Sequence, residues 1–282
     1  MKQKFKFSLA TVGVFLLMSS HIIFSVNFSV VKYLTDQYSV SQLMLFRFIA
    51  GPFFLIPYLL KPLPSFKHIR FLLGRTLFGV AAMTCLYLGF KYSNPGQVTL
   101  LFSCSIIWTY IASRIIFKEK PHIFSLWAIA LSFLGLFLIL RPDKLPLTLG
   151  VIFPLLGSFF NTGMSLCLKR ARDHYSSIFI VLFFHLVSIP ILAPFADLST
   201  SLFTFTTLKW MCLVGGLSIL AQVLMTKGYK YCYTTISSAS SIIGVPLMYL
   251  SGFIFFNETL SILNGVGIFI VLGSMFVIAK YK

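Results

Sequence analysis

The sequence predicts an all-α integral membrane protein of ten transmembrane helices, because it is apolar, poor in charge and divided into evenly spaced apolar runs. Of its 282 residues, 58% are hydrophobic and 10% are charged, and the mean hydropathy is +0.93. Soluble domains carry about 25% charged and about 45–50% apolar residues. A soluble enzyme, a disordered protein and a secreted disulfide scaffold are therefore excluded.

Ten apolar runs have the length of a bilayer-spanning helix, which takes about 20 residues. They are continuous rather than alternating, and because hydrocarbon admits only helices or closed barrels, the runs favour helices. The predicted spans are 9–34, 38–60, 69–90, 95–117, 122–140, 147–169, 177–196, 206–227, 232–256 and 260–279. Turn signals such as Asn94-Pro95 and Arg141-Pro142 separate them.

The first run follows a basic start at Lys2 and Lys4 that is also typical of a signal peptide. It continues past His21 and Asn27 to Lys32 without a small-residue cleavage site. We therefore expect it to remain in the protein as the first helix.

Lys and Arg are distributed unequally between the two sides that ten spans create. One side holds 17 of them, Arg75 included, the other holds 5, and Arg47 lies inside a span. Basic residues favour the cytoplasmic side, so both termini are expected there. The net charge of +17 is spread in small groups between apolar runs, which is typical of contact with anionic lipid and not with nucleic acid. Five scattered cysteines without a CxxC pair suggest no metal site, and no cofactor is expected.

The two halves of the chain match each other over long stretches. A shift of 139 residues pairs Gly89 with Gly228, Lys91 with Lys230, Tyr110 with Tyr249 and Glu119 with Glu258; a shift of 138 pairs Arg47 with His185, and one of 137 pairs Lys32 with Lys169. We predict two repeats of five helices, residues 1–144 and 145–282. Because five is odd, the second repeat enters the membrane from the opposite face, as in many secondary transporters.

Several short motifs accompany this architecture. They are Lys32-Tyr33-Leu34, Phe46-Arg47-Phe48, and the helix endings Phe117-Lys118-Glu119 and Phe256-Asn257-Glu258. With the five-plus-five repeat, they resemble the EamA branch of the drug/metabolite transporter superfamily over essentially the whole chain. The resemblance implies an alternating-access carrier whose cavity is lined mainly by the first, third, fourth, sixth, eighth and ninth helices, with the fifth and tenth more peripheral. The fourth helix has Ile107 where the ninth has Pro246, so hinge-like bending is less expected in the fourth helix than in the ninth.

Few charged side chains lie within the predicted spans, and such residues mark functional sites by default. Arg47 lies nine residues into the second span, about 13 Å of helix rise from its end, and His185 lies equally deep in the seventh. Arg47 presents a planar fork of donors that suits a carboxylate, phosphate or other anionic group. The alternative is that both side chains tie neighbouring helix backbones together.

Polar side chains on the cavity helices are further candidates for substrate binding. Ser20, Phe24 and Asn27 share one face of the first helix, and His21, Ser25, Phe28 and Lys32 form the adjoining face. Asn161 and Gln222 are lone amides in the sixth and eighth helices. Interhelical hydrogen bonds are the alternative role of these amides.

Aromatic residues of the fourth and ninth helices complete the candidate site. Trp108, Tyr110 and Tyr249 are candidates for walls around an organic substrate, although lipid-facing or core packing is the alternative. Glu119 and Glu258 close these two helices. Because a negative charge at a helix C-terminus is unfavourable, each is expected to have a basic or helix-N-terminal partner.

Motifs for an enzyme or an ATP-driven motor are missing from the sequence. We expect a secondary carrier in the cell inner (cytoplasmic) membrane, monomeric or weakly dimeric, that moves a small organic metabolite. An amino acid or a nucleoside-like zwitterion such as S-adenosylmethionine, which one branch of the family takes up, suits a mixed apolar and polar cavity. No carboxylate is expected near the midplane, which favours exchange or facilitated flux over proton coupling. A channel and a non-transporting scaffold or receptor are the alternatives.

Overall fold

The computed structural model describes residues 9–59, 62, 64–140, 149–196, 204–256 and 261–281, and these residues form helices without any strand. The helices are α1 (Leu9–Leu34), α2 (Val40–Leu59), η1 (Phe66–His68), α3 (Ile69–Tyr92), α4 (Pro95–Phe102), α5 (Ser105–Ile116), α6 (Ile123–Leu140), α7 (Leu149–His174), α8 (Ser177–Leu192), η3 (Ala193–Phe195), α9 (Phe205–Gly228), α10 (Thr234–Ala239), η5 (Ser240–Ile243), α11 (Gly244–Phe256) and α12 (Ile262–Lys280). Within the described ranges they combine into ten rods, because α4 runs on into α5 and α10 continues through η5 into α11.

Seven of the ten rods are long and apolar enough to cross a membrane, and the other three are shorter apolar helices. The all-α class and the ten helices are therefore confirmed. The predicted first span coincides with α1, whereas α7 continues to His174, five residues beyond its expected end. The sequence Lys169-Arg170 suggested a loop, yet basic side chains are favourable in the last turns of a helix. The expected boundary between the repeats, 144/145, lies outside the described residues.

Both the fourth and the ninth rod are interrupted, although bending was less expected in the fourth. The fourth breaks between α4 and α5, where Ile106 N–H bonds to Ser103 O at 3.0 Å in a tighter turn. The Ser103 hydroxyl also donates to Thr99 O at 2.8 Å. A hydroxyl that bonds the carbonyl four residues earlier often bends a helix, and this bond lies at the break.

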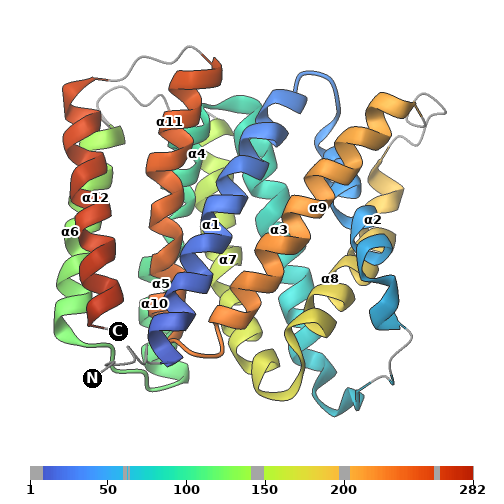
Figure 1. Ribbon diagram of the computed structural model, residues 1–282, viewed down its shortest axis with the longest axis horizontal. Helices are drawn as coiled ribbons and strands as arrows, with labels where there is room; N and C mark the ends of the chain where they lie inside the picture. The colour runs from blue at the N-terminus through green and yellow to red at the C-terminus, as the bar shows by residue number, and fades with distance from the viewer. Residues whose placement is uncertain are drawn as a thin grey trace, which may run out of the picture.

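The rods pack as one bundle with a helix pair at its side. Figure 1 shows α6 and α12 together at one side, apart from α2 and α8 at the other. In the interior, α1 packs along α9 and α3 packs along α7. Each of these contacts joins one helix from each half of the chain, so the centre of the bundle is built by both halves.

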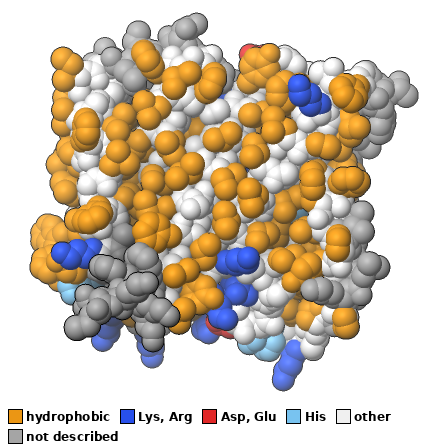
Figure 2. Space-filling view, viewed as in Figure 1, with side chains coloured by type: hydrophobic (Ala, Val, Ile, Leu, Met, Phe, Trp, Pro, Cys, Tyr) orange, Lys and Arg blue, Asp and Glu red, His pale blue; other side chains and the backbone are white. Residues whose placement is uncertain are grey.

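The surface of the bundle is apolar around its middle and basic at one edge. Figure 2 shows hydrophobic side chains over most of one face, with Lys and Arg gathered mainly at the lower edge. The first turn of α1 and the last turn of α12 lie at that same edge (Figure 1). Large apolar side chains such as Phe205, which is 85% exposed, have hydrocarbon as their natural surroundings.

Glu119 connects the two halves at the start of the ninth rod. Its carboxylate accepts hydrogen bonds from Thr234 N–H (2.8 and 2.9 Å), Thr234 Oγ1 (2.8 Å) and Thr235 N–H (3.4 Å). The expected helix-N-terminal partner of Glu119 is therefore confirmed. Glu258 lies outside the described residues.

Candidate functional site

A cavity lies at the centre of the bundle, between helices of both halves. Its lining comes from α1, α2, α3, α4, α7, α8, α9 and the segment α10–η5–α11. A water-sized sphere can reach about 80 Å³ of space within it, compared with the roughly 10–15 Å³ that one water molecule needs. The cavity therefore has room for a small ligand group as well as water.

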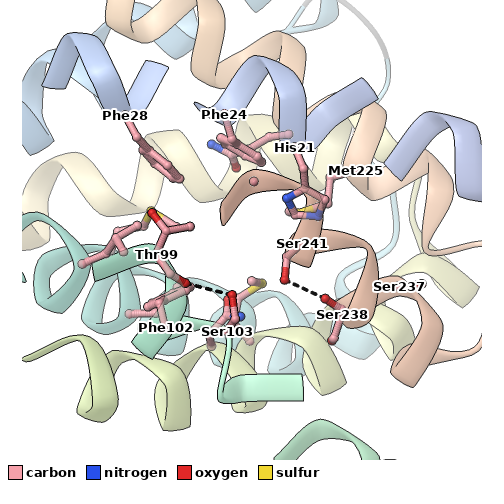
Figure 3. A pocket seen from close by; sticks show the side chains of 18 of the residues that line it. His21, Phe24, Phe28, Thr99, Phe102, Ser103, Met225, Ser237, Ser238 and Ser241 are labelled. Carbon is pink, nitrogen blue, oxygen red and sulfur yellow. Dashed lines mark hydrogen bonds between the residues drawn. The ribbon is translucent and has the colours of Figure 1, made fainter. Parts of the chain in front are cut away.

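One wall of the cavity is aromatic. Figure 3 shows His21, Phe24 and Phe28 of α1 on one side, with Thr99 and Phe102 of α4 across from them. The rings of Phe24 and Phe28 are stacked, with centroids 5.6 Å apart. This wall offers a flat apolar surface to an organic ligand.

The interrupted ninth rod supplies a hydroxyl-rich wall. Ser237, Ser238 and Ser241 line the cavity where α10 gives way to η5 (Figure 3). Ser241 Oγ donates to Ser238 O at 2.7 Å, and Tyr229 Oη donates to Ser165 Oγ at 3.0 Å beside this wall. The rod changes here from α-helical to tighter 3-10 turns, and such a stretch within a helix often marks a functional hinge.

Arg47 reaches the cavity from α2 and is 1% exposed. Its Nη1 donates to Tyr87 Oη at 3.2 Å, and its guanidinium carbon lies 5.5 Å from the centre of the Phe24 ring. Its Nε has no hydrogen-bond partner in the described part of the chain. The side chain thus places a positive charge beside the aromatic wall.

Arg75 of α3 is the second buried cation, and the sequence count that assigned it to the cytoplasmic side is wrong. It is 2% exposed and lines the cavity, where Nη2 donates to Gln222 Oε1 at 2.9 Å. Its guanidinium carbon lies 3.6 Å from the centre of the Phe184 ring. Arg75 stands six residues inside the predicted third span, about 9 Å of helix rise, and this depth was the signal that it belongs to the interior.

Carboxylates are missing from the described lining of the cavity. Asp36, Glu119 and Asp173 are the acidic residues in the described ranges, and none of them is among the lining residues. The described residues also contain no group of three or more His, Cys, Asp or Glu side chains arranged to hold a metal ion. The charge of the site therefore comes from its arginines.

Four of the ten residues predicted from the sequence meet around the cavity: Phe24, Arg47, Asn161 and Gln222. Asn161 also donates from Nδ2 to Ser105 Oγ at 3.1 Å, which joins α7 to α5.

Three others are buried between helices, outside the lining. Asn27 Nδ2 donates to Val214 O at 2.7 Å and so joins α1 to α9. Ser20 Oγ donates to Leu17 O at 2.6 Å within its own helix. His185 Nδ1 lies 2.7 Å from Val181 O.

The three predicted aromatic residues also lie outside the lining. Trp108 is 47% exposed on the outside of α5. Tyr110 Oη accepts a hydrogen bond from Arg114 at 3.4 Å, and the ring of Tyr249 packs against Gly96, where a Cβ would lie only 2.3 Å from it.

Sequence reasoning placed His21, Ser25 and Phe28 on the face adjoining the preferred face of the first helix. The structure turns these three residues and Phe24 toward the cavity. A helix that is apolar all round carries little periodic signal for its rotation, so the choice between adjoining faces had no support from the pattern.

Comparisons with known proteins agree with this architecture. Residues 11–141 match the EamA-like transporter family. The pseudopaline exporter CntI of Pseudomonas aeruginosa (strain UCBPP-PA14) is 23% identical over 264 residues, which are 90% of this chain and 92% of that protein. An uncharacterized transporter of Helicobacter pylori (strain J99) is 23% identical over 233 residues, 77% of each chain. One crystal structure, 13% identical in sequence, covers 95% of both chains with a TM-score of 0.68, so the two proteins share a fold.

The family match and the relatives' names point to transporters rather than to enzymes. The apolar helices and these relatives confirm the expected multi-pass protein of the cell inner (cytoplasmic) membrane. The resemblance drawn from the sequence motifs is confirmed as well, because residues 11–141 match the model of the EamA-like transporter family.

Proposed function

We propose that this protein is a secondary transporter that moves a small organic metabolite by alternating access, through exchange or facilitated flux. The observation that carries the proposal is the central cavity, which helices of both halves line and which two interrupted rods border. Secondary transporters bind substrate at such an interface between repeats. The substrate class we propose is an amino acid or a nucleoside-like zwitterion, held by Phe24, Arg47, Asn161 and Gln222.

Equivalent lysine contacts in the two halves support an inverted repeat. The hydrogen bonds run from Lys32 Nζ to Phe90 O (2.7 Å) and Ser93 O (3.3 Å), and from Lys169 Nζ to Tyr229 O (3.1 Å) and Cys232 O (2.6 Å). In sequence, the acceptors correspond at a shift of 139 and the lysines at 137. Each lysine therefore fixes the end of its own third helix in the same way.

The basic edge of the bundle supports cytoplasmic termini. The first turn of α1 and the last turn of α12 lie at the edge where Lys and Arg gather (Figure 2), and basic residues favour the cytoplasmic side.

Six of the residues predicted to bind substrate lie outside the cavity lining, and their role in binding stays a prediction that alanine variants test in the assays below. They are Ser20, Asn27, Trp108, Tyr110, His185 and Tyr249.

Transport is tested with purified protein in liposomes, supplied with L-amino acids, nucleosides and S-adenosylmethionine. We expect saturable, stereoselective flux of at least one class, and both directions are measured because one relative is named an exporter. Flux that rises linearly with concentration supports a channel instead. No flux under any gradient contradicts the proposal and favours a scaffold or receptor.

Alternating access is tested with two single cysteines in a cysteine-free, transport-competent background. Phe28 and Met225 both line the cavity (Figure 3), but Phe28 lies near the end of α1 and Met225 near the end of the antiparallel α9. A transported ligand is expected to raise maleimide labelling of Phe28→Cys while lowering that of Met225→Cys, or the reverse. Simultaneous access from both sides of the membrane contradicts alternating access.

A further inference from the structure

The polar atoms of the cavity lining that lack a partner are nearly all hydrogen-bond donors. In the described part of the chain they are Nε of Arg47, Nε and Nη1 of Arg75, Nε2 of Gln222 and Oγ of Ser237. Arginine nitrogens and the amide Nε2 only donate, and of these side chains only the serine hydroxyl also accepts. The amide orientation of Gln222 is fixed, because its Oε1 already accepts from Arg75. A ligand that matches this set has to be rich in acceptors.

The positive charges of the cavity also lack a countercharge of their own. Arg47 and Arg75 are at most 2% exposed, and the described lining contains no carboxylate. A buried charge without a partner is strongly unfavourable, so retaining two of them in one cavity needs a functional reason. An anionic ligand supplies that reason.

The rest of the lining selects an organic anion over an inorganic one. Phe24, Phe28, Phe102 and Phe184 line the same cavity as the arginines. Phosphate or sulfate has no apolar part to place against these rings, whereas an organic acid has one. A planar carboxylate also fits the planar fork of a guanidinium group.

We propose that the cavity binds an organic carboxylate whose oxygens accept hydrogen bonds from Arg47 and Arg75, with Gln222 holding Arg75 in position. This inference rests on the proposed transport function and shifts its substrate class from zwitterions towards organic acids. It favours compounds of net negative charge, because the described lining has no acidic group for an ammonium or sulfonium. S-adenosylmethionine, which carries two cationic groups, is therefore expected to bind worse than a simple organic acid.

The test measures the melting temperature of the purified protein in detergent with matched pairs of probes. The pairs are phenylacetate and phenylacetamide, succinate and succinamide, and L-phenylalanine and L-phenylalaninamide, with inorganic phosphate as a separate arm. A ligand that binds only the folded state stabilises it by RT ln(1 + [L]/Kd), so at equal concentration the tighter ligand raises the melting temperature more. We expect the carboxylates to raise it and their amides to have no effect.

The variants are Arg75→Gln and Arg47→Gln, with Arg70→Gln as the matched control. Arg70 is exposed on the same helix as Arg75 and loses the same charge. Removing one partner of a buried charge pair is expected to weaken carboxylate binding at least about thirtyfold. Arg70→Gln is expected to bind carboxylates as tightly as the wild type. Arg75→Lys keeps the charge, so its carboxylate affinity is expected to lie between those of the wild type and Arg75→Gln.

The melting temperature without ligand separates an effect of the variants on ligand binding from an effect on folding. Without ligand, Arg75→Gln is expected to melt at the same temperature as the wild type or higher, because it removes a buried charge that has no countercharge. An arginine needed only for packing predicts a lower melting temperature and unchanged ligand binding, and that result overturns the inference. Equal shifts with acids and amides, a shift with phosphate alone, or no shift with any carboxylate overturn it as well.

Liposome flux distinguishes this inference from the proposed function. Saturable flux of a neutral nucleoside without any arginine-dependent carboxylate binding leaves the transporter standing and rejects the carboxylate site. Carboxylate binding that depends on Arg75, without flux of any compound, supports the site and rejects transport.

Discussion

The variant Gly267→Ala is expected to lower the melting temperature of the protein by forcing α6 and α12 apart. A Cβ at Gly267 would lie 2.5 Å from the carbonyl oxygen of Gly135 and 2.6 Å from Cγ1 of Ile139. The carbonyl belongs to the backbone of a helix and has no rotamer through which to move away. Overpacking of this kind costs about 1–3 kcal/mol, and the two helices pack mainly on each other.

Gly273→Ala on the same helix is the control for this prediction. A Cβ at Gly273 meets no atom within 4 Å, so the substitution keeps only the gain in helix propensity, about 1 kcal/mol. Since both variants share that gain, the difference in their melting temperatures reports the close approach alone. Equal melting temperatures for the two variants in the same detergent contradict the prediction.

The positions of the helices were predictable because the bilayer requires long apolar runs. α1, for example, begins and ends where its apolar run does. The break after α4 was not predictable from proline content, because it lies at Ser103 and not at a proline. A serine in an apolar run has several available partners, and only the folded structure decides which one it takes.

The candidate site was predictable at the level of helices and less so at the level of residues. Arg47 was found because a charge deep in a span stands out, and Arg75 was missed because it was counted with the basic residues near the start of its span. Asn27 and Gln222 look alike in sequence, yet one joins two helices and the other lines the cavity. Asn27 bonds to Val214 O and Gln222 bonds to Arg75. Because both amides form a hydrogen bond inside the protein, residue type alone does not tell a helix-joining amide from a cavity-lining one.

The variant Glu119→Ala is expected to have the other large effect on stability. Glu119 is 7% exposed, and its two carboxylate oxygens accept from Thr234 N–H, Thr234 Oγ1 and Thr235 N–H. Alanine leaves these donors buried without a partner, and a hydrogen bond to a charged group contributes about 1.5–3 kcal/mol. The free energy of unfolding is therefore expected to fall by about 3 kcal/mol.

The effect of Glu119→Ala should be local as well as global, because Thr234 and Thr235 begin the short helix whose serines line the cavity. The amide hydrogens of these two threonines are expected to exchange faster in the variant, together with those of Ser237 and Ser238. Glu119→Gln is the matched control, since its amide keeps one acceptor oxygen and nearly the same volume, and it is expected to lie between alanine and the wild type. If alanine and glutamine give the same melting temperature and the same exchange rates, the carboxylate does not hold the start of α10, and the ninth rod owes its position to packing alone.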